Sequence, residues 1–251
     1  MTRNPIIVGN WKMHKSVDEA IVFAKALAKA TLFNSRKAIV APPFTAIYSV
    51  ASVLKNVSIA IAAQNVYEKT QGAYTGEISA PMLADVGCRY IIVGHSERRA
   101  MFGEDNSSIN RKTIATINAG LTAIICVGEV LAEKQSGVAL QIIKQQLMEA
   151  LAGISIADAK QKVIIAYEPV WAIGTGQTAT PQIAQEVHSF IRKELGLIFG
   201  LDVANSIHIL YGGSVNVDNV SNLMAQSDID GVLVGGASLV VEDFIKIINY
   251  L

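Results

Sequence analysis

Eight short runs rich in isoleucine and valine recur along the 251-residue chain, and they constrain its fold more than any other feature. Each run is too short for an ordinary helix and ends near polar residues or glycine, as buried strands do. Segments with apolar residues at helical spacing separate the runs. We therefore expect strands and helices to alternate throughout. The expected strands are 6–10, 38–41, 58–63, 90–93, 121–127, 163–168, 206–211 and 230–234.

Several of the intervening segments carry helix start and stop signals. Ser16 and Glu19 have the spacing of a capping box, in which each side chain bonds the other residue's backbone. Pro181 and Gly196 fit the first position of a helix and the position just past its end. The clearest expected helices are 16–30, 138–153, 180–196 and 238–251.

Eight strands alternating with eight helical stretches predict a parallel sheet with right-handed crossovers. A closed (β/α)8 barrel fits the strand count and the usual length of about 250 residues. An open doubly wound sheet is the alternative, but no GxGxxG motif follows the first strand to support a dinucleotide fold. The chain contains no linker or low-complexity segment, so we expect a single catalytic domain over residues 1–251.

Composition narrows the class of protein. Hydrophobic residues make up 51%, yet no apolar run approaches the roughly 20 residues of a membrane-spanning helix. Lys+Arg and Asp+Glu balance at 21 each, which disfavours nucleic-acid and membrane-surface binding. The start "MTRNPIIVGNWK" lacks the features of a signal peptide, and two cysteines are too few for a disulfide framework. A cytoplasmic protein with reduced thiols is the expectation.

Titratable residues and glycine-rich turns follow five of the expected strands. In parallel barrels the functional site lies at the carboxyl ends of the strands, so these residues are expected to converge on one rim. Any one of them alone would more often be structural. Together they offer a base, a cation, a neutral donor and turns suited to an anion. The residues are Asn10, Lys12, His95, Glu97 and Glu168, with the turns 211–214 (YGGS) and 234–236 (VGG).

Other reactive residue types lack such neighbours in the sequence. His14, His188 and His208 do not lie beside a second candidate group, and we expect them to be structural. Cys126 lies inside an apolar strand, where a core role is more common than that of a nucleophile.

Five motifs, "GNWKM", "VGHSERR", "AYEPVWAIGTG", "YGGSV" and "VGGASL", occur in this order, and "QNVYEKTQGAYTGE" lies between the first two. On these motifs the chain resembles the triosephosphate isomerase family over essentially its whole length. The resemblance implies a TIM barrel and an aldose–ketose isomerase (an intramolecular oxidoreductase) of glycolysis and gluconeogenesis. It would interconvert dihydroxyacetone phosphate and D-glyceraldehyde 3-phosphate through an enediolate, without a metal or an organic cofactor.

Residue roles follow from the same resemblance. Glu168 would be the base and His95, as a neutral imidazole, the electrophile and acid. Lys12 and Asn10 would polarise the substrate and bind its charge, with Glu97 as a supporting residue. Backbone amides of four residues would hold the substrate phosphate. These are Gly174, Ser214, Gly235 and Gly236.

The segment 169–179 reads as a lid over the site. Pro169 restricts the backbone directly after Glu168, and an apolar stretch follows it. Gly174 and Gly176 allow the backbone to approach a phosphate closely. Closure of such a segment would exclude water and protect the enediolate from loss of phosphate.

The segment 64–79 is long for a barrel connection and carries Tyr67, Ala73, Tyr74 and Thr75 near its tip. Aromatic residues are enriched in protein interfaces. A flexible surface loop is the alternative. The resemblance implies a C2 homodimer in which Thr75 reaches the neighbouring subunit's active site.

The chain departs from the family pattern at His14, Gln177 and His208, none of which is a catalytic group. Two other functions stay open at this point. One is a Schiff-base aldolase on a phosphate-binding barrel with Lys12 as the nucleophile. The other is a barrel that serves as a non-catalytic scaffold.

Overall fold

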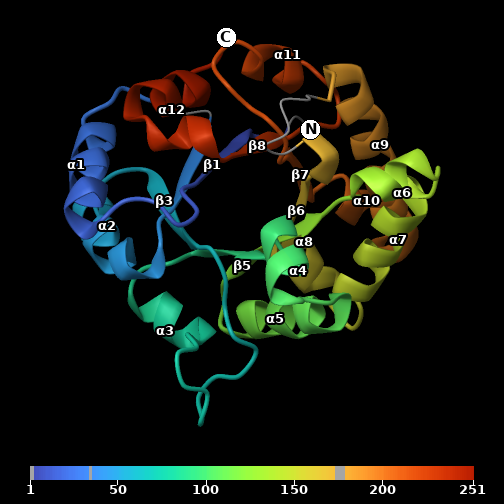
Figure 1. Cartoon of the computed structure of the whole chain (residues 1–251), viewed down its shortest axis with the longest axis horizontal. Helices are drawn as coiled ribbons and strands as arrows, with labels where there is room; N and C mark the ends of the chain where they lie inside the picture. The colour runs from blue at the N-terminus through green and yellow to red at the C-terminus, as the bar shows by residue number, and fades with distance from the viewer. Residues whose placement is uncertain (1–2, 34–35, 173–178) are drawn as a thin grey trace.

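The computed structural model describes residues 3–33, 36–172 and 179–251. Eight parallel strands pair in sequence order, and the last pairs with the first to close a barrel (Figure 1). This confirms the expected (β/α)8 TIM barrel. The strands are β1 (Ile6–Asn10), β2 (Lys37–Ala41), β3 (Ile59–Ala63), β4 (Tyr90–Val93), β5 (Thr122–Val127), β6 (Val163–Tyr167), β7 (His208–Tyr211) and β8 (Gly231–Val234).

Helices form an outer ring around the barrel (Figure 1). Several connections carry two or more helices, so the described residues hold more helices than the eight expected stretches. None of them has both the length and the apolar character needed to cross a membrane. The α-helices are α1 (Val17–Ala28), α2 (Ile47–Leu54), α3 (Ala80–Asp85), α4 (Ser96–Phe102), α5 (Asn106–Asn118), α6 (Leu131–Gln135), α7 (Ala139–Ala150), α8 (Ile156–Lys162), α9 (Pro181–Phe199), α10 (Leu201–Ala204), α11 (Val220–Met224) and α12 (Val241–Ile248), and the 3₁₀ turns are η1 (Phe44–Ala46), η2 (Val170–Ala172) and η3 (Gly236–Leu239).

The helix boundaries test the start and stop signals. Ser16 caps α1, and its capping box with Glu19 is confirmed. The expected stop at Gly196 is wrong, because α9 continues to Phe199. A Cβ on Gly196 would come within 3.2 Å of Leu201 in α10, so this glycine permits close helix packing and does not end the helix. The expected helix 238–251 is also shorter, because the 3₁₀ turn η3 occupies its beginning.

Two apolar cores hold the barrel together. Alternate strand residues, such as Val8, Ile92 and Leu210, fill its interior. The residues between them, such as Ile7 and Ile91, pack outward against the ring of helices. Because the interior is filled by side chains, a small molecule can enter only at the mouths of the barrel.

Candidate active site

A cavity of about 400 Å³ opens at the carboxyl-terminal mouth of the barrel. Residues that end or follow β1, β4, β6, β7 and β8 line it, so the rim predicted from the sequence is formed. The volume falls within the range of small-molecule sites. Its lining comprises Asn10, Lys12, His95, Glu168, Gly212, Gly213, Ser214, Val215, Asn216, Leu233, Gly235, Gly236 and Ala237.

Glu168 follows the last residue of β6, and its backbone N–H donates to the carbonyl of Val127 at 2.8 Å. Its carboxylate is 2% exposed. The backbone N–H of Ser96 donates to Oε2 at 2.9 Å, and the Ser96 hydroxyl lies 3.3 Å from Oε1. Oε1 is also 2.9 Å from Nε2 of His95. Burial favours the neutral acid, but the contacts with His95 and Ser96 outweigh it and lower the pKa of Glu168.

His95 precedes the first residue of α4 and caps this helix. Its Nδ1 accepts the backbone N–H of Glu97 at 3.2 Å. A ring nitrogen that accepts a hydrogen bond carries no proton, so the geometry assigns the hydrogen to Nε2, which faces Glu168. Burial disfavours the imidazolium, whereas the Glu168 and Glu97 carboxylates raise the pKa of His95. The hydrogen bond that Nδ1 accepts from the Glu97 N–H requires the neutral ring, and we assign the neutral form on that contact.

Lys12 reaches the cavity from a backbone conformation that few side-chain-bearing residues adopt, with φ of 52°. Two hydrogen bonds hold the Lys12 backbone in this conformation. The backbone N–H donates to Oδ1 of Asn10 at 3.1 Å, and the backbone carbonyl accepts from Nε2 of Gln64 at 2.8 Å. The Lys12 ammonium lies 2.6 Å from Oε1 of Glu97. A positive φ held by several partners is a form of strain found at functional sites.

The glycine-rich turns complete the cavity. The N–H of Gly212 donates to the carbonyl of Tyr167 at 2.7 Å, which joins the ends of β6 and β7. A Cβ on Gly213 would lie 2.3 Å from the Tyr211 hydroxyl, so a larger residue does not fit. Ser214 donates to the carbonyl of Ala172 at 3.1 Å, connecting this turn to η2.

Nearly all of the predicted site residues meet at this mouth. Glu97 contributes through Lys12, and Ser214, Gly235 and Gly236 line the cavity. Gly174 and most of the predicted lid fall in residues 173–178, which lie outside the described residues. Thr75 is exposed on the segment between β3 and α3, which projects outward from the ring (Figure 1).

Ser96 and Gln64 contact the predicted groups at this mouth but had not been predicted, and Gly212 had been predicted only as part of the turn 211–214. Ser96 sits within the "VGHSERR" motif, and Gly212 within "YGGSV". Their place in these motifs was the available signal. Within the described ranges, no three His, Cys, Asp or Glu side chains are placed to hold a metal ion.

Comparison with known proteins shows which family the chain belongs to. The family model described as triosephosphate isomerase matches residues 5–251. A triosephosphate isomerase of Endomicrobium trichonymphae is 51% identical over 249 residues, covering 99% of each chain. Those of Herpetosiphon aurantiacus and Chloroflexus aurantiacus are 51% and 49% identical, again over 99% of each chain. The chain therefore belongs to the triosephosphate isomerase family.

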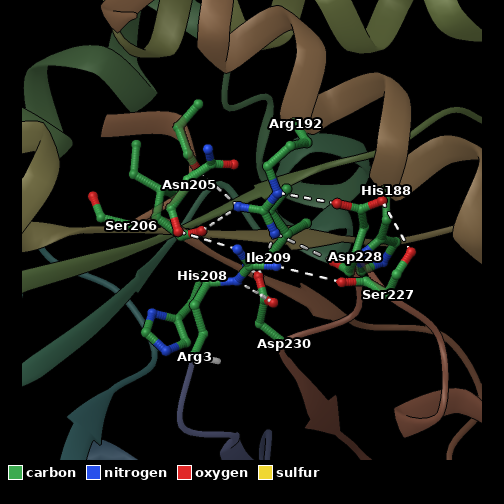
Figure 2. Close-up of polar contacts among 12 residues, drawn as sticks. Arg3, His188, Arg192, Asn205, Ser206, His208, Ile209, Ser227, Asp228 and Asp230 are labelled. Atoms are coloured by element: carbon green, nitrogen blue, oxygen red, sulfur yellow. Dashed lines mark hydrogen bonds and ion pairs between the residues drawn. The ribbon is translucent and has the colours of Figure 1, made fainter. Parts of the chain in front are cut away.

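Of the three residues that depart from the triosephosphate isomerase pattern, the two that the structure describes do not line the cavity. His14 is exposed. His208, labelled in Figure 2, begins β7 at the opposite, amino-terminal end of the barrel. Its ring contacts the carbonyl of Asn4 at 3.0 Å. Gln177 lies outside the described residues. Neither described departure lines the mouth that holds Glu168.

Proposed function

We propose that this chain interconverts dihydroxyacetone phosphate and D-glyceraldehyde 3-phosphate through an enediolate, as an aldose–ketose isomerase of glycolysis and gluconeogenesis. The observation that carries the proposal is one cavity that joins a buried carboxylate, a neutral imidazole, an ammonium and two glycine-rich turns. Within a triosephosphate isomerase family member, these groups supply every element that the reaction needs.

Glu168 is the base that moves the proton between the two carbons. Its pKa is lowered, so the carboxylate is ionised at neutral pH and ready to accept a proton. Both of its oxygens are engaged by Ser96 or His95. To reach a substrate carbon, the carboxylate has to exchange these partners for the substrate. A single positioned acid or base contributes about 10²–10⁴-fold to a rate, so other groups must also act.

His95 and Lys12 stabilise the negative charge that develops on the substrate oxygens. The Nε2–H of His95 is a neutral donor that faces Glu168 and becomes free for the substrate when the carboxylate moves, and Lys12 supplies a positive charge with Asn10 beside it. Loss of one such preorganised donor typically costs about 10²–10³-fold in turnover. Ser214, Gly235 and Gly236 line the part of the cavity that we assign to the substrate phosphate.

The test is a coupled assay on purified protein. Glyceraldehyde 3-phosphate is supplied with glycerol-3-phosphate dehydrogenase and NADH, and loss of NADH absorbance reports dihydroxyacetone phosphate. The account predicts substrate-dependent turnover that Glu168→Gln largely removes. An inactive but folded wild-type protein would support the scaffold alternative instead.

The aldolase alternative is tested separately with Lys12. Nζ of Lys12 lies 2.6 Å from Oε1 of Glu97, and formation of a Schiff base on Lys12 would have to break this contact. Borohydride treatment with substrate should therefore leave Lys12 unmodified in the mass spectrum. A reduced covalent adduct on Lys12 would favour the aldolase.

A C2 homodimer is the proposed assembly. The loop after β1, the turn η1, the helices α2, α3 and α4 and the projecting segment 64–79 belong to the first half of the barrel (Figure 1). Large apolar side chains on these elements are exposed, which an isolated surface disfavours. We propose that a second copy covers them and that its Thr75 steadies Asn10 and Lys12. The exposed residues are Met13, Phe44, Tyr48, Tyr74, Met82, Met101 and Phe102.

Sedimentation across a dilution series, with activity followed in parallel, tests the dimer. Activity is expected to fall as the dimer dissociates, and Tyr48→Glu should shift dissociation to higher protein concentration. Val22→Glu on α1 is the matched control, because Val22 is exposed on a helix outside this surface. A monomer that is fully active at every concentration would exclude the proposal.

We also propose a cytoplasmic location, because Cys88 and Cys126 are free, buried thiols.

A further inference from the structure

Arg99 on α4 ties together the ends of two barrel strands. Its Nε donates to the carbonyl of Gly94, directly after β4, at 2.9 Å. Its Nη2 donates to the carbonyl of Cys126, near the end of β5, also at 2.9 Å. Its Nη1 donates to Oδ1 of Asn106 at 2.6 Å. A planar guanidinium with several fixed donors can hold such an arrangement, whereas a single ammonium cannot.

Both carbonyls belong to residues that support the proposed catalytic groups. Gly94 precedes His95 and has φ of 70°, and a Cβ there would lie 2.7 Å from Ile109. The backbone that carries His95 is therefore tightly constrained. The thiol of Cys126 is close enough to the Glu168 carboxylate to help lower the pKa of that carboxyl. Arg99 thus holds Gly94, which precedes His95, and Cys126, which lies against Glu168.

The charge of Arg99 is unusual for its setting. Among the described residues, no carboxylate lies within salt-bridge distance of its guanidinium, whereas the adjacent Arg98 pairs with Glu104 at 2.5 Å. Burial lowers the pKa of Arg99, and the neighbouring Cys126 and Glu168 groups oppose that effect. A partly buried cation without a salt-bridge partner costs free energy, and here the three hydrogen bonds of the guanidinium offset that cost.

We propose that Arg99 is a positioning residue for the isomerisation: by bonding the ends of β4 and β5 it sets the distance between His95 and Glu168. It does not line the cavity assigned to the substrate. The inference rests on the proposed function, because it concerns the geometry of that reaction. It predicts an effect on turnover that exceeds any effect on substrate binding.

A second cavity makes the inference testable by chemical rescue. This cavity, of about 430 Å³, shares Glu168 with the cavity assigned to the substrate and is lined by Arg99, Ser96 and Asn106. Removal of the Arg99 side chain would enlarge it at the position that the guanidinium occupied. A small planar cation from solution can then enter and bond the same carbonyls.

The experiment compares kcat and KM of the wild type with those of Arg99→Met, Arg99→Lys and Arg99→Ala. Misplacement on the scale of 1 Å costs about 10²-fold, so we expect kcat of Arg99→Met to fall by about 10- to 100-fold with KM changed less than about threefold. Arg99→Lys should recover part of kcat. Millimolar guanidinium should raise kcat of Arg99→Ala several-fold, whereas sodium chloride at equal ionic strength should not.

Arg3→Met is the matched control. Arg3 also makes three hydrogen bonds, two of them to carbonyls, but at the amino-terminal end of the barrel (Figure 2). Its loss should lower the thermal midpoint and leave kcat within about twofold of the wild type.

Three results would overturn the inference. They are an Arg99→Met kcat that falls no further than that of Arg3→Met, a fall in activity that resides in KM, and an Arg99→Ala variant that guanidinium does not rescue. If Arg99→Met does not fold, Arg99→Lys decides, because a kcat equal to the wild type would show that the fork geometry is not needed. An inactive wild type would instead refute the proposed function.

Discussion

Gly212→Ala should impair catalysis without unfolding the barrel, because this glycine leaves space for Glu168. A Cβ on Gly212 would lie 3.0 Å from Cγ of Glu168 and 3.2 Å from the carbonyl of Tyr167. Ordinary contact begins at about 3.4 Å, so one side has to retreat by a few tenths of an ångström. The Tyr167 carbonyl is held by the Gly212 N–H at 2.7 Å and belongs to β6, so the Glu168 side chain is the part that moves.

The expected loss follows from that displacement. If 1 Å costs about 10²-fold, a shift of about 0.4 Å costs roughly 5- to 10-fold in kcat. KM should change little, because the methyl group is directed at the base. Steady-state kinetics in the coupled assay measure both constants, and circular dichroism checks the fold.

Gly236→Ala separates this effect from a general response to alanine. A Cβ on Gly236 meets nothing within 4 Å, but the residue lines the part of the cavity assigned to phosphate. This variant should therefore raise KM more than it lowers kcat. A Gly212→Ala enzyme with wild-type kcat would refute the reasoning that places the base against this glycine.

Three further predictions concern single groups. Glu168→Gln should lose at least about 10²-fold in kcat, and Glu168→Asp, which retracts the carboxylate by about 1 Å, should lose about 10²-fold; stopped assays at high enzyme concentration measure both. Lys12→Met should weaken competitive inhibition by inorganic phosphate in parallel with turnover, and unchanged phosphate inhibition would exclude its role in binding the phosphate. Burial lowers the pKa of His188 from 6.5 to about 4, so the unfolded chain takes up this proton first as the pH falls. Stability from His188 is thus complete above pH 6.5 and should decline by about 2 kcal/mol by pH 5 in chemical denaturation, and His188→Asn should flatten this decline.

The strands were predictable from sequence because both faces of each strand are buried. Such strands appear as continuous apolar runs, and runs such as "IIVGN" and "YIIV" coincide with β1 and β4. Helix ends were less predictable where tertiary packing competes with a local signal. Glycine is the residue type that often ends a helix, but Gly196 lies inside α9. It is needed there because Leu201 of α10 packs closely against it.

The candidate site was predictable where chemistry and strand ends coincide, as for Lys12, His95 and Glu168. Residues that act by hydrogen-bonding the backbone of other site residues left no such signal. Gln64 follows β3 by one position, yet its amide holds the carbonyls of Lys12 and Ala41. Arg99 could equally have been an exposed helical arginine, because only the folded barrel shows which carbonyls it reaches.

The central claim is that Glu168 moves a proton between two substrate carbons, and isomerisation in D₂O followed by proton NMR tests it most directly. The reaction starts from dihydroxyacetone phosphate. A carboxylate that takes the proton from C1 and exchanges it with solvent then delivers deuterium to C2 of the glyceraldehyde 3-phosphate that forms. The account predicts deuterium in the product formed by the wild type and loss of both exchange and isomerisation in Glu168→Gln. Product without deuterium, or exchange at the wild-type rate in Glu168→Gln, would contradict it.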